Sequence, residues 1–563
     1  MIGLNKIGLN QVQLNRLRLN APFPAYGKMA GGGGSGDGFP QLPGDVTRWH
    51  FGGLTNEMMA AMDDPRIEDA DHKGRFLSFK NFAWKEGSGI SDVYPGALVF
   101  DGVDDYGVCD NFPILTKEKG YTVVALRQWI SMGEGLYGLV SNVKNWFNDG
   151  AFVLEYNSNN ATNKFVNRPV SFGNVNIEMD LPNNFTYQTS KSYKGVPITT
   201  GSFKGTNSLF VGKLNNIIGN CSNVAIWELV FLDHDATEEE LTKIKDYFVK
   251  TYPWLFPDQA WTVVGKTNED EDRATIANIT GNGNDLVLSN FGFAEGSGYG
   301  LYKLNFNNWF ANSGSGNVNI VNVVNPHKIV LEQSQEAVGA FFLGKNVSYS
   351  GELKISVSNK PSDIELSFGS TALGKVILNE GINIVKINPV NTSIGFFTNK
   401  AFEAQNIIIE QIPEYKGYLL TDGVDDKAVS KQFKFGENFT VILDFKFPVK
   451  KISYCGFDLS SKVRIQNLQG SGVYVVLKGN KTLIPSNVVR AVTSEGKVYD
   501  ENWNEYNIVP GNISSNYTMV NLGFDGSNQF AESATKLAGI YSSTLSKDDC
   551  IKAYNYLQTL KAK

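Results

Sequence analysis

Two short acidic motifs carry the side chains with the clearest capacity for chemistry. Residues 101–105 read Asp-Gly-Val-Asp-Asp, and the same five residues recur at 422–426. Carboxylate oxygens suit Ca²⁺, so the acidic pairs are candidate calcium ligands. The competing interpretation is structural, because calcium takes about six to eight oxygens: the first Asp caps an Asp-Gly turn and the others lie on an exposed strand end. The candidate ligands are Asp104, Asp105, Asp425 and Asp426.

Aromatic side chains form a second group with a chemical use, because an exposed ring stacks on the apolar face of a sugar. Most aromatic residues of β-sandwiches lie in the core, so each candidate also has a purely structural explanation. The candidate glycan-binding residues are Tyr137, Trp146, Trp309 and Trp503.

Cysteine and histidine give no sign of a metal or catalytic centre. The four residues of each type are dispersed, without the close spacing of zinc ligands. A disulfide in each half of the chain is conceivable, but buried free thiols are the favoured interpretation. The sequence predicts no zinc site and no His-based catalysis.

Composition excludes several classes of protein. The net charge of −6 over 563 residues argues against a nucleic-acid partner, which would need a basic face. No apolar run approaches the roughly 20 residues that span a bilayer, so no membrane insertion is expected. The 57 glycines and 19% charged residues favour a turn-rich, mainly β protein.

Internal repeats organise the chain. Residues 81–89 match 290–298, and each Asp-Gly motif opens a run of strands that ends in an amphipathic helix. Thr237 and Glu240 predict a capping box for the first helix, and Ser546 caps the second. Apolar alternation between the repeats predicts an inserted sandwich with strands at 328–331, 353–357, 363–368, 382–387 and 406–410.

The predicted fold class is mainly β, with several antiparallel β-sandwiches and short capping helices. The predicted segments are a docking peptide (1–28), a Gly-rich linker (29–44), a leader (45–96), a first sandwich (97–256), a second leader (257–299), an inserted sandwich (300–416) and a second Asp-Gly sandwich (417–563).

The N-terminus carries a pentapeptide repeat whose apolar spacing alternates two and three. That spacing fits neither a helix nor a flat strand, so we expect an extended or solenoid-like segment that orders against another chain; a disordered tail is the alternative. The segment lacks the continuous apolar stretch of a secretion signal. The predicted docking residues are Leu4, Leu9, Leu14, Leu19, Asn5, Asn10, Asn15 and Asn20.

The two Asp-Gly modules resemble the laminin-G-like branch of the concanavalin A-like lectin and glucanase superfamily. The resemblance lies in the strand 100–106, the strand 121–126 and the closing segment from Ile226, with the same order at 422–426, 439–443 and 540–546. It implies two jelly rolls that bind glycans or proteins, in some relatives with calcium. The inserted sandwich more weakly resembles a carbohydrate-binding module.

The hydrolases of that superfamily carry a Glu-x-Asp-x-Glu strand, because retaining cleavage needs two carboxylates about 5 Å apart. The nearest approach is Glu178-Met179-Asp180, where Pro182 occupies the next matching position, and the acidic run 269–272 is more typical of a solvated face. We therefore expect a protein that is not an enzyme.

The docking peptide, the Gly tether and the lectin-like modules together resemble head- or tail-fibre proteins of crAss-like phages of gut Bacteroides-type bacteria. The resemblance implies a virion structural or adhesion protein, a fibre or capsid decoration. Its expected partners are capsid or tail proteins of the same particle and host-surface or mucosal glycans, and fibres of this kind are commonly homotrimers. Such a protein assembles in the host cytoplasm and acts outside it. The alternatives are a polysaccharide-degrading enzyme and a bacterial cell-surface lectin.

Overall fold

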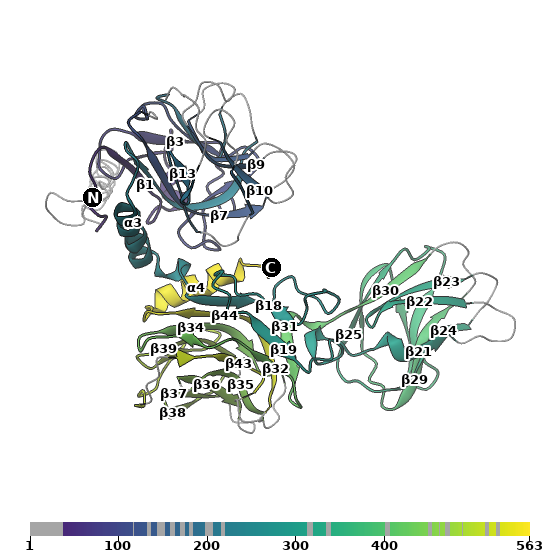
Figure 1. Cartoon of the computed structure of the whole chain (residues 1–563). Coiled ribbons are helices and arrows are strands. Elements are labelled where there is room, and N and C mark those ends of the chain that lie inside the picture. Colours follow the sequence, from purple (N-terminus) through teal and green to yellow (C-terminus); the bar gives the residue numbers. More distant parts are fainter. Residues whose placement is uncertain are drawn as a thin grey trace, which may run out of the picture. The chain divides into compact units, whose positions relative to one another are not determined.

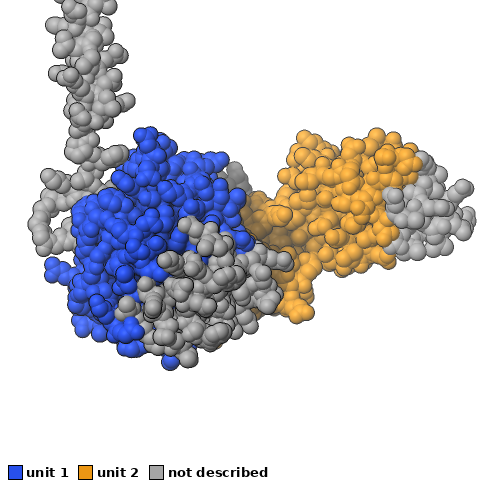
Figure 2. Space-filling view, turned by 90° about the horizontal axis from the view of Figure 1, so that it is seen from above, with its two compact units in different colours: residues 1–256 blue, residues 257–563 orange. Residues whose placement is uncertain are grey.

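A computed structural model describes most of the chain from residue 38 onward. The residues outside this description are 1–37, 116–117, 132–136, 143–151, 158–163, 169–174, 179–183, 198–205, 216–219, 312–318, 334–338, 400–405, 449–452, 461, 468–472, 487, 513–516, 525–529 and 563. The chain divides into two compact units, residues 1–256 and 257–563, which are coloured separately in Figure 2. Among the described residues, no helix is long and apolar enough to cross a membrane.

The first unit is a sandwich of two eight-stranded antiparallel sheets, called here sandwich 1 (Figure 1). One sheet, in spatial order, is β14 (Val196–Pro197), β13 (Ser192–Tyr193), β12 (Phe185–Thr189), β7 (Thr122–Ser131), β16 (Asn223–Leu232), β5 (Leu98–Asp101) and β4 (Gly89–Ile90), with β1 (Val46–His50) also beside β16. The other is β11 (Val175–Glu178), β10 (Lys164–Arg168), β9 (Val153–Asn157), β8 (Tyr137–Ser141), β15 (Leu209–Val211), β6 (Tyr106–Cys109), β3 (Phe76–Lys80) and β2 (Arg66–Glu68).

The second unit contains a sandwich of the same size, called sandwich 2. One sheet is β20 (Gly298–Leu301), β31 (Glu414–Asp422), β44 (Glu532–Tyr541), β34 (Thr440–Lys446), β39 (Val488–Thr493), β40 (Lys497–Tyr499) and β41 (Glu505–Asn507), with β17 (Gln259–Thr262) also beside β44. The other is β18 (Thr275–Ile276), β19 (Leu286–Ser289), β32 (Lys427–Val429), β43 (Val520–Leu522), β35 (Ser453–Leu459), β36 (Val463–Asn467), β37 (Val473–Leu477) and β38 (Asn480–Ile484). A two-stranded ribbon joins β33 (Phe433–Lys434) and β42 (Tyr517–Thr518).

Sandwich 3 is the predicted insert and has two five-stranded sheets with a core of their own. The first is β21 (Trp309–Ala311), β24 (Gly339–Val347), β29 (Thr392–Thr398), β26 (Leu366–Ser370) and β27 (Gly374–Leu378). The second is β22 (Asn319–Asn325), β23 (Lys328–Gln333), β30 (Ile407–Ile412), β25 (Leu353–Ser358) and β28 (Gly381–Val385). All five strands predicted for the insert are present, with shifted ends at β26 and β28. The 3₁₀ turn η2 (Phe306–Asn308) leads into β21.

The described helices are few and short: α2 (Asn56–Ala60), α3 (Glu238–Thr251), α4 (Lys547–Gln558) and the 3₁₀ turn η1 (Pro253–Leu255). The capping box of α3 is confirmed, since Thr237 and Glu240 satisfy each other's backbone groups. Ser546 accepts from the backbone N–H of Asp549 at the start of α4. The fold class is thus confirmed as mainly β, built of antiparallel sandwiches with short closing helices.

The two predicted leaders are parts of the sandwiches rather than segments of their own. In sandwich 1, β1 pairs with β16, β3 with β6 and β4 with β5. In sandwich 2, β17, β19 and β20 pair in the corresponding way with β44, β32 and β31. Backbone groups at a sheet edge need partners, and the leader strands supply them. The repeat in the sequence therefore spans a whole sandwich, interrupted in its second copy by sandwich 3.

The cysteines settle one open alternative. All four are free and buried, so the interpretation as buried thiols is confirmed and the alternative of one disulfide per half is wrong. Because burial raises the pKa of the Cys550 thiol to about 12, this group stays neutral at ordinary pH.

Candidate functional site

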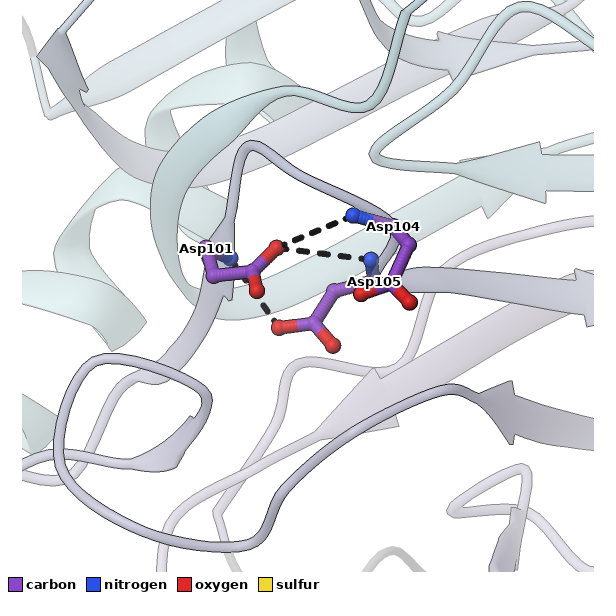
Figure 3. Close-up of side chains that lie close together, drawn as sticks. All are labelled: Asp101, Asp104 and Asp105. Atoms are coloured by element: carbon purple, nitrogen blue, oxygen red, sulfur yellow. Dashed lines mark hydrogen bonds between the residues drawn. The ribbon is translucent and has the colours of Figure 1, made fainter.

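The acidic motif of sandwich 1 folds into a turn that is held by its own carboxylates (Figure 3). Asp101 Oδ1 accepts hydrogen bonds from the backbone N–H groups of Val103, at 2.7 Å, and Asp104, at 3.2 Å. Asp105 Oδ2 accepts in return from the backbone N–H of Asp101, at 3.0 Å. Asp101 ends β5 of one sheet and Tyr106 begins β6 of the other, so the turn crosses between sheets rather than joining a hairpin.

The second copy repeats this geometry. Asp422 Oδ1 accepts from the backbone N–H of Val424, at 2.8 Å, and Asp426 Oδ2 accepts from that of Asp422, also at 2.8 Å. The leader holds the turn from outside, because the Asn290 amide donates to the Asp425 carbonyl oxygen and Ser297 Oγ to Asp426 Oδ1. In sandwich 1 the Asn81 amide makes the corresponding bond to Asp104. This contact explains why leader and turn are duplicated together.

The last Asp of each turn is fully buried. Burial disfavours the carboxylate and raises the pKa of Asp105 to about 6 and that of Asp426 to about 7, although hydrogen bonds from Ser88 and Ser297, respectively, oppose the shift. Each turn therefore holds a carboxyl group that binds a proton more tightly than an ordinary Asp does.

The fit of calcium to these turns is incomplete. Asp101, Asp104 and Asp105 bring carboxylate oxygens within 4.8 Å of one another, as do their counterparts in sandwich 2. The first and last Asp of each turn, however, already use one oxygen on backbone N–H groups. The oxygens left over fall short of the about six to eight that calcium takes. The geometry is accounted for by the turn alone, and the calcium site stays a prediction.

The four aromatic candidates end up in different places. Trp309 lies in the core of sandwich 3, with its ring centroid 5.1 Å from that of Phe306, so it is not placed to stack on a sugar. Tyr137 is half-buried and packs against the core of sandwich 1. Trp146 lies outside the described residues, as do all eight predicted docking residues of the N-terminal repeat. Trp503 alone is half-exposed beside other aromatic and charged groups.

An ionic cluster next to Trp503 lies under the closing helix of sandwich 2. We call it the Asp444 cluster; its members are Asp444 of β34, Arg490 of β39, Tyr418 of β31, and Tyr554 and Gln558 of α4. Tyr418 donates to Asp444 Oδ1 at 3.0 Å and Arg490 pairs with the same oxygen. Tyr554 and Gln558 donate to Oδ2 at 3.2 and 3.0 Å. The carboxylate is thus satisfied by four donors from three elements.

Aromatic rings extend this cluster on both sides. On one side the Trp503 ring meets that of Tyr554 edge-on, with centroids 5.9 Å apart. On the other, Lys446 Nζ lies 4.2 Å from the ring centroid of Tyr418 and 4.6 Å from that of Tyr415. The guanidinium of Arg490 lies over the Tyr554 ring at 4.5 Å. We call this continuous set, from Tyr415 to Trp503, the aromatic row.

The two end residues of the row have unusual backbones. Tyr415 has φ of 53° and Trp503 has φ of 60°, the left-handed region that bulky residues rarely adopt. Asp500 holds the turn that contains Trp503, since its Oδ1 accepts from the backbone N–H groups of Asn502 and Asn504, both at 2.9 Å. Strain of this kind persists where the surrounding structure imposes it, and it is often found at binding sites.

Electrostatics fixes the protonation of the row. Burial pushes the pKa of Asp444 up, but the charge and hydrogen bond of Arg490, with those of Gln558 and Tyr418, outweigh it, so that pKa lies below its usual value. Burial, with the Asp444 charge, raises the pKa of Tyr418 and of Tyr554. The carboxylate is therefore ionised and both phenols keep their protons, so each donates a hydrogen bond.

Of the row, sequence reasoning named only Trp503, whose glycan-binding role stays a prediction. A signal was present in β34, where Thr440, Asp444 and Lys446 interrupt an otherwise apolar strand at even positions and so share one face. Tyr418 and Tyr554 could not be assigned to the same face without knowing that β31 lies one strand away from β34, across β44, and that α4 packs on β34.

A second buried ionic network, in sandwich 1, is closed to ligands. Glu155 accepts hydrogen bonds from Arg127, Trp129, Thr186 and Tyr193, the last two at 2.6 Å. All five residues are buried. Burial raises the pKa of Glu155 but Arg127 outweighs it and brings that pKa to about 2. This network stabilises the core rather than a binding surface.

No protein-family model matches the chain, and no curated protein matches its sequence. Among solved structures, the binding domain of botulinum neurotoxin DC in complex with rat synaptotagmin II is similar over 84% of this chain and 96% of that one, at 10% identity and a TM-score of 0.27. The botulinum neurotoxin type G receptor-binding domain is similar over 69% of this chain and 86% of that one, at 10% identity and a TM-score of 0.25.

A Trypanosoma rangeli sialidase in complex with sialic acid is similar over 36% of this chain, at 10% identity and a TM-score of 0.26. The chain spans 33% of the length of that sialidase. TM-scores this low carry no argument about function, so the candidate site stands on its own geometry.

Proposed function

We propose that this chain is a non-enzymatic adhesion protein of a phage particle, and that it binds host-surface or mucosal glycans through the aromatic row of sandwich 2. The observation that carries the proposal is the row itself. The half-buried rings of Tyr415, Tyr418, Tyr554 and Trp503 form a chain of contacts with the charged groups of Lys446 and Arg490.

Sugars combine apolar ring faces with hydroxyl groups, and the row offers a partner for both. Rings at Tyr415 and Trp503 supply flat apolar surface, and the ammonium group of Lys446 supplies hydrogen-bond donors. The Asp444 cluster between them is already satisfied, so it orients Tyr554 and Arg490 without needing a ligand. A preformed site of this kind loses little conformational entropy on binding.

The particle-associated role is supported by the N-terminal repeat and the Gly-rich tether rather than by the sandwiches. A short apolar-polar repeat that cannot bury a core alone is suited to ordering against another chain, such as a capsid or tail protein. The tether at residues 31–38 would let the sandwiches project from that anchor. Assembly as a homotrimer in the host cytoplasm, followed by action outside the cell, belongs to the same proposal.

A glycan array with the full chain tests the binding role, with bacterial capsular polysaccharides and mucin glycans as probes. We expect Trp503→Ala and Tyr415→Ala each to weaken binding by about tenfold, which corresponds to about 1.4 kcal/mol. Phe76→Ala is the matched control, because Phe76 is a partly exposed ring on sandwich 1 with a cation beside it. Binding that survives both variants unchanged would refute the assignment to the row.

Purified particles test the anchoring role. Full-length protein should copurify with them, and a variant lacking residues 1–38 should be lost while its sandwiches keep the same melting temperature. Equal amounts of both forms on particles would contradict the docking role of the repeat. Release of reducing sugar from the array polysaccharides would contradict the non-enzymatic proposal.

A further inference from the structure

Strand β28, at the end of one sheet of sandwich 3, is an edge without the usual protection. The sheet order is β22-β23-β30-β25-β28, and among the described strands only β25 pairs with β28. Edge strands normally carry a charge or a proline that blocks further pairing. The five residues of β28, Gly-Ile-Asn-Ile-Val, carry neither. The edge strand β38 of sandwich 2, by contrast, contains Lys481.

The side chains of β28 make this edge apolar as well. Ile382 is 71% exposed and Ile384 is 51% exposed, while Asn383 and Val385 point inward. The alternation of exposed and buried residues continues past the end of the strand to Lys386, which lies on the exposed face, and Glu380 is exposed in the stretch 379–382 that leads into the strand. Two isoleucines thus stand on the outer face of an open edge, flanked by one acidic and one basic side chain.

This order of residues is complementary to itself. If two copies of β28 pair antiparallel about a two-fold axis at Asn383, Asn383 faces its own counterpart. Residues equally far before and after Asn383 then face each other, so their numbers sum to 766. Ile382 then faces Ile384 of the second copy, and Glu380 faces Lys386. Apolar and opposite-charge pairs directly across an antiparallel ladder both stabilise it. The same face of each sheet continues into the other, so no buried residue is turned outward.

Present contacts of the flanking charges leave room for this pairing. Glu380 accepts from the backbone N–H groups of Asn359 and Lys360, at 3.0 and 2.9 Å. Lys386 forms a 3.0 Å ion pair with Glu352, but both side chains are largely exposed. Such a surface pair is worth little, so exchange of Glu352 for Glu380 of the second copy costs little.

We propose that sandwich 3 is a self-association module, in which β28 pairs with β28 of a second copy of this chain to join two five-stranded sheets into one. The partner is a second copy because the exposed pattern matches its own reverse in both apolar and charged positions. The contact is isologous, so the two β28 edges satisfy each other and leave no open edge at this point for a further copy. It goes beyond glycan binding and uses a different sandwich.

A disulfide test reads the register directly. In the full chain, Ile382→Cys/Ile384→Cys places two cysteines opposite each other across the proposed axis, within the separation that a disulfide spans. Mild oxidation should give a covalent dimer whose cross-linked peptide joins the two 382–384 segments. The unmodified chain is the control, because its four cysteines are buried. No dimer with this linkage, or one formed equally by a double-cysteine variant at Val323 and Val324 on the opposite edge, would overturn the proposal.

A charge-swap series separates pairing from folding. Sedimentation of full-length Glu380→Lys and of Lys386→Glu should each show the self-association constant weakened by about tenfold, which corresponds to about 1.4 kcal/mol. The double variant should recover most of that loss, since opposite charges again face each other. A double variant that associates no better than the single ones would overturn the register, and association unaffected by Ile384→Lys would overturn the interface.

Discussion

Sandwiches 1 and 2 each carry an acidic residue at the same level of two central, paired strands. The strand of the pair that carries the acid differs between the two sandwiches. In sandwich 1 the acid is Glu228 on β16, and its cross-strand partner on β7 is Leu126. In sandwich 2 the acid is Asp444 on β34, and its cross-strand partner on β44 is Leu537. The strand that holds the acid in one sandwich holds the leucine in the other.

The arginine that pairs with the acid also comes from a different flank of the sheet in each sandwich. Arg48 comes from the leader strand β1 and donates to Glu228 at 2.9 Å. Arg490 comes from β39, on the other flank of the central strands, and pairs with Asp444. Both closing helices contribute a tyrosine to the acid, Tyr247 of α3 and Tyr554 of α4, and Tyr252, the residue after α3, adds another in sandwich 1. The need is the same in both, because a carboxylate buried under a helix requires several donors.

The two clusters differ in how far they are exposed to solvent. Glu228 and Arg48 are sealed, at 0% and 1% exposure, and the Phe39 ring covers Arg48 at 4.4 Å. Asp444 and Arg490 are 4% and 17% exposed, and the neighbouring Trp503 ring stays half-exposed. The cluster of acid, arginine and tyrosine under the closing helix is therefore part of the core in sandwich 1 and borders an accessible surface in sandwich 2. This difference is why we propose the binding surface on sandwich 2 rather than on sandwich 1.

The largest test of this comparison is Glu228→Ala. Removal of the acid leaves Arg48 buried without its partner, which should destabilise sandwich 1 by about 3–5 kcal/mol. Hydrogen exchange of the β16 amides during chemical denaturation would measure the loss, with the β44 amides as internal control. A loss below about 1 kcal/mol would mean that the first cluster is not sealed.

Asp444→Ala should cost less, about 2–3 kcal/mol, because Arg490 can turn toward water when its partner is gone. It should also abolish glycan binding, since Tyr554 and Arg490 lose their common anchor. Exchange of the β44 amides and the glycan array would follow the two effects together. Glycan binding retained at full strength would separate the ionic cluster from the aromatic row.

The buried turns predict an opposite pH response to that of ordinary Asp residues. The folded-state pKa of Asp105, about 6, and of Asp426, about 7, both exceed the ordinary value of 3.8. The folded chain therefore binds these protons more tightly than the unfolded chain does, so their stabilising contribution is complete below pH 4 and is lost as pH rises through 6 and 7. The melting temperature should depend less on pH between 4 and 8 in Asp426→Asn than in the unmodified chain. In Asp105→Asn the same weakening should appear over a lower pH range.

The helix caps give the smallest difference. Thr237→Ala should destabilise α3 by about 1 kcal/mol, because the hydroxyl accepts from the Glu240 backbone N–H and donates to the Glu240 carboxylate, and both bonds are lost. Ser546→Ala removes the two equivalent bonds of α4, from the Asp549 backbone N–H to Ser546 Oγ and from Ser546 Oγ to the Asp549 carboxylate, so a loss of similar size is expected. Circular dichroism melting of both variants would compare them, and losses that differ severalfold would contradict this equivalence.

Much of the architecture could be predicted from the sequence because it depends on local pattern. Alternation in β23, β25 and β30 predicted the insert, and Thr237 with Glu240 predicted the start of α3. The leaders could not be placed, because pairing of β1 with β16 joins residues about 180 positions apart and no local signal reports it. Trp309 was assigned to the surface for the same reason, since its burial depends on Phe306, Phe342 and Phe396 together.

The acidic motif separates what the sequence determines from what the tertiary structure determines. The sequence by itself determined that Asp-Gly-Val-Asp-Asp is a repeated turn, because Gly and Asp favour that backbone wherever they occur in this order. Only the tertiary structure decided that Asp105 and Asp426 are buried, and that Asn81 and Asn290 of the leaders bind these turns. It likewise decided that Asp444 meets Tyr418, Arg490 and Tyr554, because four elements far apart in the chain must converge before the aromatic row exists.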